Sequence, residues 1–368
     1  MVYQPLKGLT VVAIEQAVAA PFTTSRLADA GAEVIKIERP EGDFARGYDD
    51  VANGQSSYFV WLNRGKTSVT LDLASDEGRE ELARLLDGAD VLVQNLKRGA
   101  LEKLGFSFER LAREWPRLIT CSITGYGENG PMADRKAYDL LIQAESGLCS
   151  ITGGPEAAAR VGISIVDIAT GATAHAAILE ALIARGVTGR GAQISVSMFD
   201  VMADWLTVPL LNHEGGKSPR RLGMAHPSIA PYSVFTCSDG KPILISVQSD
   251  REWRKLADVF LGRPELGSDP RFATNVARVR NRPETDSLVA EGFARRTAEE
   301  ASLALLKADV AFASVSDMKL LSQHPHLRRI TVETPNGPVS YPAPAAVISG
   351  EQRSYGPVPA LNRVEVKA

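Results

Sequence analysis

The sequence predicts an α/β protein with a large domain built on a Rossmann-like parallel sheet and a smaller α+β domain. Two observations support this prediction. Near the N-terminus, an apolar run at Leu9–Ile14, a helical segment at Ala19–Ala30 and a second apolar run at Glu33–Ile37 form a strand–helix–strand unit, which is typical of parallel sheets. Later in the chain, alternating runs at Tyr232–Cys237 and Pro242–Val247 flank an Asp-Gly pair, which indicates a β-hairpin.

The rest of the large domain continues the alternation of strand and helix. We expect an amphipathic helix at Ser75–Asp87, with acidic residues in its first turn. Further strands are predicted within Asn63–Leu73 and at Val91–Gln94, Leu118–Ile123 and Gln193–Met198. The turn after the first strand lacks the G-x-G-x-x-G pattern, so the sequence does not support a nicotinamide dinucleotide site.

The composition is that of an ordinary globular protein and argues against several function classes. The 368 residues are 44% hydrophobic and 23% charged, and a net charge of −3 argues against a nucleic-acid binder. Cys121, Cys149 and Cys237 show neither metal-ligand spacing nor a disulfide framework, and the histidines show no ligand spacing, so we expect no metal site and a cytoplasmic location. No signal peptide and no apolar run of about 20 residues is evident, so no membrane association is expected.

The segment around Asp167 has the strongest chemical pattern. The β-branched run Ile163–Val166 predicts the end of a buried strand, and Asp167 directly precedes a helical pattern that ends at Arg185-Gly186. A carboxylate at a strand-to-helix junction can be a reactive group close to polarising backbone N–H groups. By local pattern alone, Asp167 can equally be an ordinary helix N-cap.

A resemblance favours the reactive role. The pattern G-x-x-x-x-D-x-x-[TS]-G around Asp167, the alanine-rich helix and TGRGAQI resemble the family III CoA-transferases, as do the opening GLTVVAIEQAVAAPFTTSRLADAGAEVIKIERPEGD and VLVQNLKRGALEKLGF. The resemblance covers nearly the whole chain. It implies that Asp167 is the covalent nucleophile, that an aspartyl-CoA thioester forms, and that coenzyme A is a cosubstrate with no permanently bound cofactor. Backbone N–H groups near Gln16–Ala19 and at the helix start after Asp167 would hold the developing oxyanions.

The same resemblance assigns the other site residues. The active site would be lined by Gln16, Ala17, Val18, Tyr126, Tyr138 and His226. Coenzyme A would be contacted by Arg39, Leu71, Asn95, Leu96, Arg98, Ala100, Lys103 and Leu104. The glycine-rich loop that closes over the site in larger relatives is missing here, where the chain has only MAHPSIAPY.

The substrates implied are an acyl-CoA and a small carboxylic acid. Similarity to transferases of small dicarboxylates suggests mesaconate, itaconate, citramalate or succinate, and the free carboxylate of such an acid needs a cation. Candidates for that cation are Arg46, Arg64, Arg135 and Arg221. One alternative is an α-methylacyl-CoA racemase or epimerase, but the racemising relatives carry a histidine where Tyr138 stands, and tyrosine is a poor base at neutral pH. A second alternative is an inactive CoA-binding protein.

The expected domain organisation also follows from the resemblance. Residues 1–200 would form the large CoA-binding domain, 201–223 a linker, 224–311 the small domain, 312–344 a returning linker, and 345–368 a C-terminal part of the large domain. In the family two such chains interlock as linked rings, which implies a homodimer.

Overall fold

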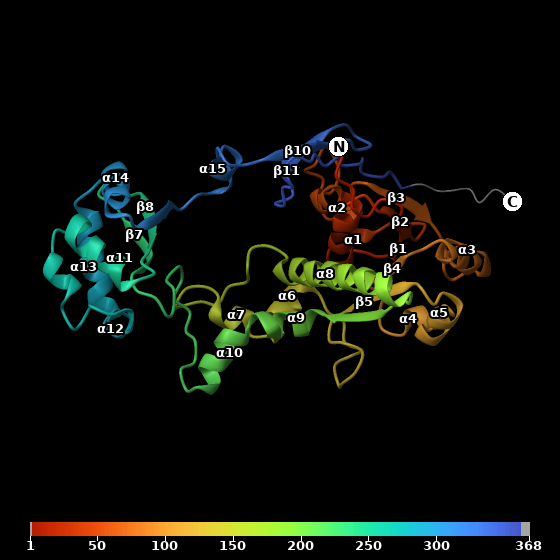
Figure 1. Cartoon of the computed structure of the whole chain (residues 1–368), viewed down its shortest axis with the longest axis horizontal. Coiled ribbons are helices and arrows are strands. Elements are labelled where there is room, and N and C mark those ends of the chain that lie inside the picture. Colours follow the sequence, from red (N-terminus) through yellow and green to blue (C-terminus); the bar gives the residue numbers. More distant parts are fainter. Residues whose placement is uncertain (1, 362–368) are drawn as a thin grey trace. The chain divides into compact units, whose positions relative to one another are not determined.

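The computed structural model describes residues 2–361 and consists of two compact units (Figure 1). The first contains residues 2–148, 161–208 and 328–361, and the second contains residues 149–160 and 209–327. Each unit has a hydrophobic core of its own. Residues 362–368 of the predicted C-terminal part lie outside the described residues.

The first unit is built on a six-stranded, fully parallel sheet in the order β3-β2-β1-β4-β5-β6, which confirms the predicted α/β fold. The strands are β1 (Thr10–Ile14), β2 (Glu33–Glu38), β3 (Lys66–Thr70), β4 (Val91–Gln94), β5 (Ile119–Thr124) and β6 (Gln193–Ser197). After β1 the chain adds β2 and β3 on one side of the sheet, and after β4 it adds β5 and β6 on the other side. The chain therefore diverges beyond the carboxyl ends of β1 and β4, where open α/β sheets usually bind ligands.

Helices cover both faces of this sheet. Val11 and Ala13 of β1 pack towards α1 and α8, whereas Val12 and Ile14 pack towards the opposite layer. The first layer comprises α1 (Ala19–Asp29), α6 (Asp139–Glu145), α8 (Ile165–Thr188) and α9 (Met198–Trp205). The opposite layer comprises α3 (Asp76–Asp87), α4 (Ala100–Lys103) and α5 (Phe108–Glu114).

Smaller elements complete the first unit. A short 3₁₀ helix, η1 (Phe44–Gly47), and α2 (Ser57–Asn63) lie between β2 and β3 in the sequence. The returning C-terminal segment forms the antiparallel hairpin β10 (Arg329–Val332) and β11 (Val339–Pro342), and Val332 and Val358 pack against Phe59 and Val60 of α2.

Helix α8 corrects the predicted strand at Ile163–Val166. The helix begins at Ile165, and the side chain of Ile163 is 54% exposed, because the β-branched run turns into the helix instead of entering the sheet. It ends at Thr188, past the predicted stop, with Gly189 in the left-handed conformation at φ 72°. Of the described helices, α8 alone has the length and apolar composition of a membrane span, but core helices meet the same criteria.

Helices α1 and α8 pack closely at Gly171. A Cβ atom at this position would lie 2.5 Å from the Ala19 carbonyl oxygen, so only glycine permits the observed approach. The Thr23 hydroxyl strengthens the contact by donating to the Gly171 carbonyl at 3.0 Å. This packing places the first two turns of α8 beside the start of α1.

The second unit contains an antiparallel sheet in the order β7-β8-β9, with a helical layer. The predicted hairpin is confirmed as β7 (Tyr232–Thr236) and β8 (Pro242–Ser246). A third strand, β9 (Ala311–Ser314), was not predicted. The helices are α11 (Asp250–Lys255), α12 (Asn275–Arg280), α13 (Arg282–Ala294), α14 (Ala298–Ala308) and α15 (Met318–Ser322), with a π-helical turn, η2 (Leu256–Phe260), and a 3₁₀ turn, η3 (Pro264–Gly267).

Two helices span the boundaries between the units in the sequence, α7 (Leu148–Ile151) and α10 (Thr207–Glu214). The division differs from the predicted domain boundaries at residues 149–160, which belong to the second unit. There the Arg221 guanidinium donates to the carbonyl oxygens of Ser150, Gly154 and Pro155, at 3.1–3.3 Å. These contacts explain the division, because they tie the segment to the chain that follows α10.

The close approach of α1 and α8 makes a first prediction. Gly171→Ala forces the helices apart, and we expect a loss of about 1–3 kcal/mol in the free energy of unfolding, measured by denaturant titration. The matched control is Gly186→Ala in the same helix, where a Cβ atom meets nothing within 4 Å. The control should raise stability by roughly 0.5–1 kcal/mol. Equal stability of the two variants would contradict the proposed packing constraint.

Candidate active site

The turn between β1 and α1 lies at the carboxyl end of β1, and neighbouring side chains bind its backbone. The Gln16 N–H donates to Asn95 Oδ1 at 3.0 Å, and Asn95 Nδ2 donates to the Gln16 carbonyl at 2.8 Å. The next amide, that of Ala17, donates to Asp43 Oδ1 at 3.2 Å, and Ala17 has a φ of 63°. An L-residue rarely adopts this left-handed conformation, so these hydrogen bonds hold a strained turn in place.

A network of buried, paired charges contacts this turn through Asp43. Lys36 and Lys66 are completely buried; Lys36 pairs with Asp43 at 2.9 Å, and Lys66 pairs with Glu15 at 2.6 Å. Glu38, also buried, is held by Arg46 at 2.7 Å. The network thus contains three carboxylates and three cations.

Burial and pairing compete in setting the pKa values of these groups. Burial alone would raise the pKa of Glu38, but hydrogen bonds from Arg46 and Ser68 lower it to about 2. Burial lowers the pKa of Lys66 to about 8 although Glu15 opposes it. Burial also disfavours the charge of Lys36, but Glu15 and Asp43 outweigh it and raise its pKa. The carboxylates beside Lys36 therefore keep it charged.

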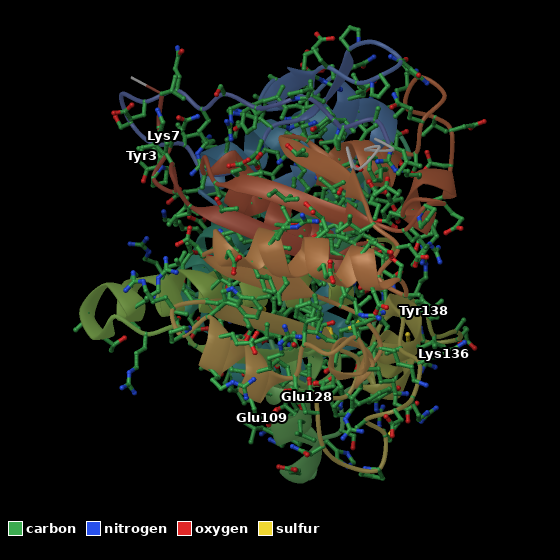
Figure 2. All side chains as sticks on the ribbon, turned by 90° about the vertical axis from the view of Figure 1, so that its right-hand side faces the viewer. Tyr3, Lys7, Glu109, Glu128, Lys136 and Tyr138 are labelled. Atoms are coloured by element: carbon green, nitrogen blue, oxygen red, sulfur yellow. The ribbon has the colours of Figure 1, made fainter. Side chains whose placement is uncertain are left out.

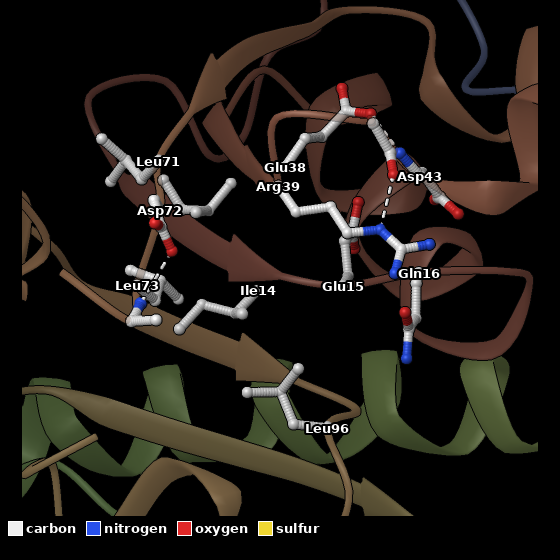
Figure 3. A pocket seen from close by; sticks show the side chains of 13 residues that line it. Ile14, Glu15, Gln16, Glu38, Arg39, Asp43, Leu71, Asp72, Leu73 and Leu96 are labelled. Carbon is white, nitrogen blue, oxygen red and sulfur yellow. Dashed lines mark hydrogen bonds between the residues drawn. The ribbon is translucent and has the colours of Figure 1, made fainter. Parts of the chain in front are cut away.

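A cavity of about 250 Å³ opens beside the turn, at the carboxyl ends of β1, β2 and β3 (Figure 3). Four of the predicted site residues line it, namely Gln16, Arg39, Leu71 and Leu96. The sequence reasoning missed the other lining residues, Ile14, Glu15, Ile37, Glu38, Gly42, Asp43, Asp72, Leu73 and Ala74. Except for Gly42 and Asp43, they lie at or just after the ends of predicted strands, and that position was the signal that could have identified them.

The remaining residues predicted to contact coenzyme A do not line this cavity. Asn95 holds the turn at Gln16, as described above. Arg98 forms an ion pair with Asp134 at 3.1 Å, so its charge is already partly neutralised. Ala100 and Lys103 begin and end helix α4, and Leu104 caps it.

The predicted active-site residue Asp167 lies in the first turn of α8 and is half-buried. Its backbone N–H donates to Asp139 Oδ1 at 3.3 Å, and that of Val166 donates to the same oxygen at 2.7 Å. Asp139 Oδ2 accepts a hydrogen bond from Gln143 at 2.6 Å. Asp139, at the start of α6, therefore caps α8, and it does not cap its own helix.

The carboxylate of Asp167 differs from that of Asp139 in its hydrogen bonding. Among residues 2–361, no group donates a hydrogen bond to it and no cation pairs with it. Burial, together with the negative charge of Asp139, raises the pKa of Asp167 to about 7. Two neighbouring carboxylates are thus separated into a structural one and a free one, as acid–base groups in active sites often are.

Aromatic side chains stand close to Asp167. The Tyr58 hydroxyl lies 3.5 Å from Ser164 Oγ, and the rings of Tyr48 and Tyr58 meet edge to face at 5.5 Å. Burial and the charges of Asp43 and Asp167 raise the pKa of Tyr48 to about 12. Sequence reasoning missed both tyrosines, because their segment has no motif.

Other predicted lining residues are distributed over both units. Tyr138 is 59% exposed at the surface of the first unit, and it contributes to the electrostatic environment of Tyr48 (Figure 2). Tyr126 packs beside Phe199 at 6.0 Å. His226 lies in the second unit, stacked on Tyr232 at 5.3 Å, and its predicted role stays a prediction.

Among the described residues of this region, the backbone amides without a hydrogen-bond acceptor lie at the start of α1. The N–H groups of Gln16 and Ala17 have acceptors, and that of Ile168, the first after Asp167, donates to the Ser164 carbonyl at 3.0 Å. This corrects the expectation that Gln16, Ala17 and the helix start after Asp167 would bind an oxyanion. The amides of Val18, Ala19 and Ala20 are buried and have no acceptor among residues 2–361. Among the same residues, no group of three or more His, Cys, Asp or Glu side chains could hold a metal ion.

Comparison with known proteins places this arrangement in a family. The profile of CoA-transferase family III matches residues 6–363, nearly the whole chain. The chain belongs to CoA-transferase family III.

Family III relatives match over most of their length. An acetyl-CoA:oxalate CoA-transferase of Acetobacter aceti is 37% identical over 94% of this chain and 90% of its own. A succinate–glutarate CoA-transferase of Agrobacterium fabrum is 39% identical over 77% and 73%, respectively. The crystal structure of a CAIB/BAIF family protein from Brucella suis superposes with a TM-score of 0.80, at 38% identity, and covers 95% of this chain and 94% of its own. This family III protein is therefore a CoA-transferase that uses CoA thioesters.

The raised pKa of Asp167 makes a prediction about stability. A carboxyl group that titrates at about 7 in the folded protein and near its ordinary value when unfolded favours the protonated form on folding. Wild-type stability should therefore fall as pH rises from about 4 to 7. Asp167→Asn cannot ionise, so at pH 8 it should be more stable than wild type by up to about 4 kcal/mol, with the advantage vanishing towards pH 4.

Denaturant titrations at pH 4, 6 and 8 measure this difference. Asp50→Asn, at an exposed carboxylate of the same unit, is the control and should show no such dependence on pH. A constant difference between Asp167→Asn and wild type across the pH range would exclude a raised pKa at this residue.

Proposed function

We propose that this transferase moves CoA between an acyl-CoA and a small dicarboxylic acid through covalent intermediates on Asp167. The observation that carries the proposal is the state of that side chain: a half-buried carboxylate with no hydrogen-bond partner among the described residues, beside a second carboxylate whose oxygens are fully used. A desolvated carboxylate is a better nucleophile than a hydrated one.

The chemistry proceeds by repeated acyl exchange. The Asp167 carboxylate attacks the thioester carbonyl of the donor, and CoA thiolate leaves to give a mixed anhydride. The thiolate then attacks the Asp167 carbonyl carbon, which releases the donor acid and forms the aspartyl-CoA thioester. The acceptor carboxylate attacks this thioester to give a second anhydride and free thiolate, which takes the acceptor acyl group and restores Asp167.

The buried amides of Val18, Ala19 and Ala20 are suited to stabilise the oxyanions of these steps. They belong to the start of α1, which packs beside the first turns of α8, and a helix N-terminus favours negative charge. Because Ala17, which precedes them, is held by Asp43, the amides are oriented before substrate binds. The cavity at Gln16, Arg39, Leu71 and Leu96 supports a CoA-binding role for that edge of the sheet.

The proposed acceptor class rests on two relatives and one arginine. The relatives described above are named for oxalate and for succinate and glutarate, all dicarboxylates. Of the four candidate cations, Arg46 is bound to Glu38, Arg64 to Asp29 and Arg221 to carbonyl oxygens. The Arg135 side chain is 56% exposed and lies 5.7 Å from the ring of Tyr126, with Glu145 as a partner at 3.5 Å. We therefore assign the distal carboxylate to Arg135.

Nucleophilic catalysis by Asp167 can be tested by trapping. Incubation of wild type with an acyl-CoA and hydroxylamine should convert Asp167 to a hydroxamate that mass spectrometry detects, because hydroxylamine attacks the anhydride or thioester. Asp167→Ala and Asp167→Asn should lose transfer and trapping while they still bind CoA. A racemase would instead exchange the α-hydrogen of a branched acyl-CoA with deuterated solvent, and such exchange without trapping would reject the proposal.

The assignment of Arg135 predicts a selective effect on the acceptor. Arg135→Gln should raise the KM for a dicarboxylic acceptor about 10-fold or more, because a charge-assisted hydrogen bond is lost. The KM for acyl-CoA and for a monocarboxylic acceptor should be unchanged. Arg113→Gln, at another exposed arginine paired with a glutamate, is the control. An equal effect on monocarboxylic and dicarboxylic acids would contradict the assignment.

The homodimer and the cytoplasmic location stay predictions of the sequence.

A further inference from the structure

We propose that Asp43 is a positioning residue of the transferase site, which holds Ala17 in the left-handed conformation and thereby orients the start of α1. This inference rests on the proposed function, since it concerns the amides assigned to the oxyanion. Asp43 follows β2 and caps η1, far in sequence from both Ala17 and Asp167.

The carboxylate of Asp43 is fully committed to other groups. Its Oδ1 accepts hydrogen bonds from the amides of Ala17 at 3.2 Å and Ala45 at 2.9 Å, and its Oδ2 pairs with Lys36 at 2.9 Å. The backbone N–H of Asp43 donates to Glu38 at 2.8 Å, which fixes the residue itself. Asp43 lines the cavity with only 5% of its surface exposed, and because both of its carboxylate oxygens are already bound, we assign it a structural role in the site.

The conformation of Ala17 needs such a support. At a φ of 63°, its Cβ atom is crowded by its own backbone, and alanine has no side-chain polar group to compensate. Asn95 binds the backbone of Gln16 on one side, while Asp43 binds the Ala17 amide itself. Without Asp43, we expect this residue to relax towards a negative φ, where alanine is unstrained.

Relaxation at Ala17 would disturb the residues that follow it directly. The left-handed residue allows β1, which ends at Ile14, to be followed by α1 at Ala19 after a turn of four residues. Val18 packs with Phe22 and Leu62, with Ile168 of α8 beside them. A change at Ala17 therefore moves the buried amides of Val18, Ala19 and Ala20 relative to α8, and displacements of about 1 Å can cost roughly 100-fold in rate.

Asp43 also connects the turn with the buried charges. Lys36 lies 2.9 Å from Asp43 and 3.5 Å from Glu15, so Asp43 is its nearer carboxylate. Because Lys36 is completely buried, it holds Asp43 without competition from solvent. The position of Ala17 is thus tied to the sheet through β2, independently of α1.

The test uses a suppressor at Ala17. Asp43→Ala should lower kcat for CoA transfer roughly 100-fold and change the KM for acyl-CoA much less. The double variant Asp43→Ala with Ala17→Gly should recover at least about 10-fold of that loss, because glycine adopts a positive φ without help.

Asp90→Ala is the matched control. Asp90 lies at the opposite end of β1, where it accepts the Thr10 amide at 2.9 Å and pairs with Arg185 at 2.8 Å. Its loss removes a comparable amide hydrogen bond and ion pair, so stability should fall while kcat stays unchanged. Equal loss of kcat in Asp43→Ala and Asp90→Ala, or failure of Ala17→Gly to restore it, would overturn the proposal.

A second measurement separates this inference from the proposed function. Hydrogen–deuterium exchange of a peptide covering residues 15–22 should be faster in Asp43→Ala than in wild type and slowed again by Ala17→Gly. Unchanged exchange in Asp43→Ala would overturn the positioning role whether or not the protein transfers CoA. A wild type with normal exchange behaviour but no transfer of CoA would reject the proposed function alone.

Discussion

The paired burial of charge on and beside β1, β2 and β3 is the constraint on which the rest of the first unit depends. Glu15 directly follows β1, Lys36 lies in β2 and Lys66 begins β3. All three are buried, and each has an oppositely charged partner within 3.5 Å. Removing one member of a buried pair typically costs about 3–5 kcal/mol, because the other charge stays desolvated. Such a network adds little net stability, but it tolerates few alternative arrangements.

The network restrains the positions of α1 and α8, the two helices of the candidate site. Asp43 and Asn95 bind the turn before α1, and the glycine contact at Gly171 sets the distance between α1 and α8. At the start of α8, Asp139 binds the amides of Val166 and Asp167, which the side chain of the N-cap residue Ser164 leaves unbound. The arrangement leaves the Asp167 carboxylate free, partly desolvated and repelled by its neighbour, which destabilises the ionised form.

Much of this architecture was predictable from sequence, because strands and helices in parallel sheets follow local hydrophobic patterns. Val91–Gln94 is a strand with the predicted bounds, and the position of Asp167 at a helix start was also correct. The prediction of a strand at Ile163–Val166 was wrong because β-branched residues at a surface turn give the same sequence pattern as a buried strand. The capping role of Asp139 could not be predicted, since its partners lie 27 and 28 residues away.

The first turn shows how this sheet differs from a dinucleotide-binding one of the same strand order. In the dinucleotide fold, glycines make that turn without strain and let a diphosphate approach the backbone. Here Ala17 adopts a left-handed conformation that a glycine would enter freely, and two side chains hold it there. The adjoining charges of Glu15, Glu38 and Asp43 are balanced by Lys36, Lys66 and Arg46, so these three cations are already paired. A glycine turn favours close approach of a ligand, whereas a braced alanine turn favours a fixed direction for the amides behind it. The second property suits the proposed mechanism, in which several successive oxyanions would be stabilised by these amides.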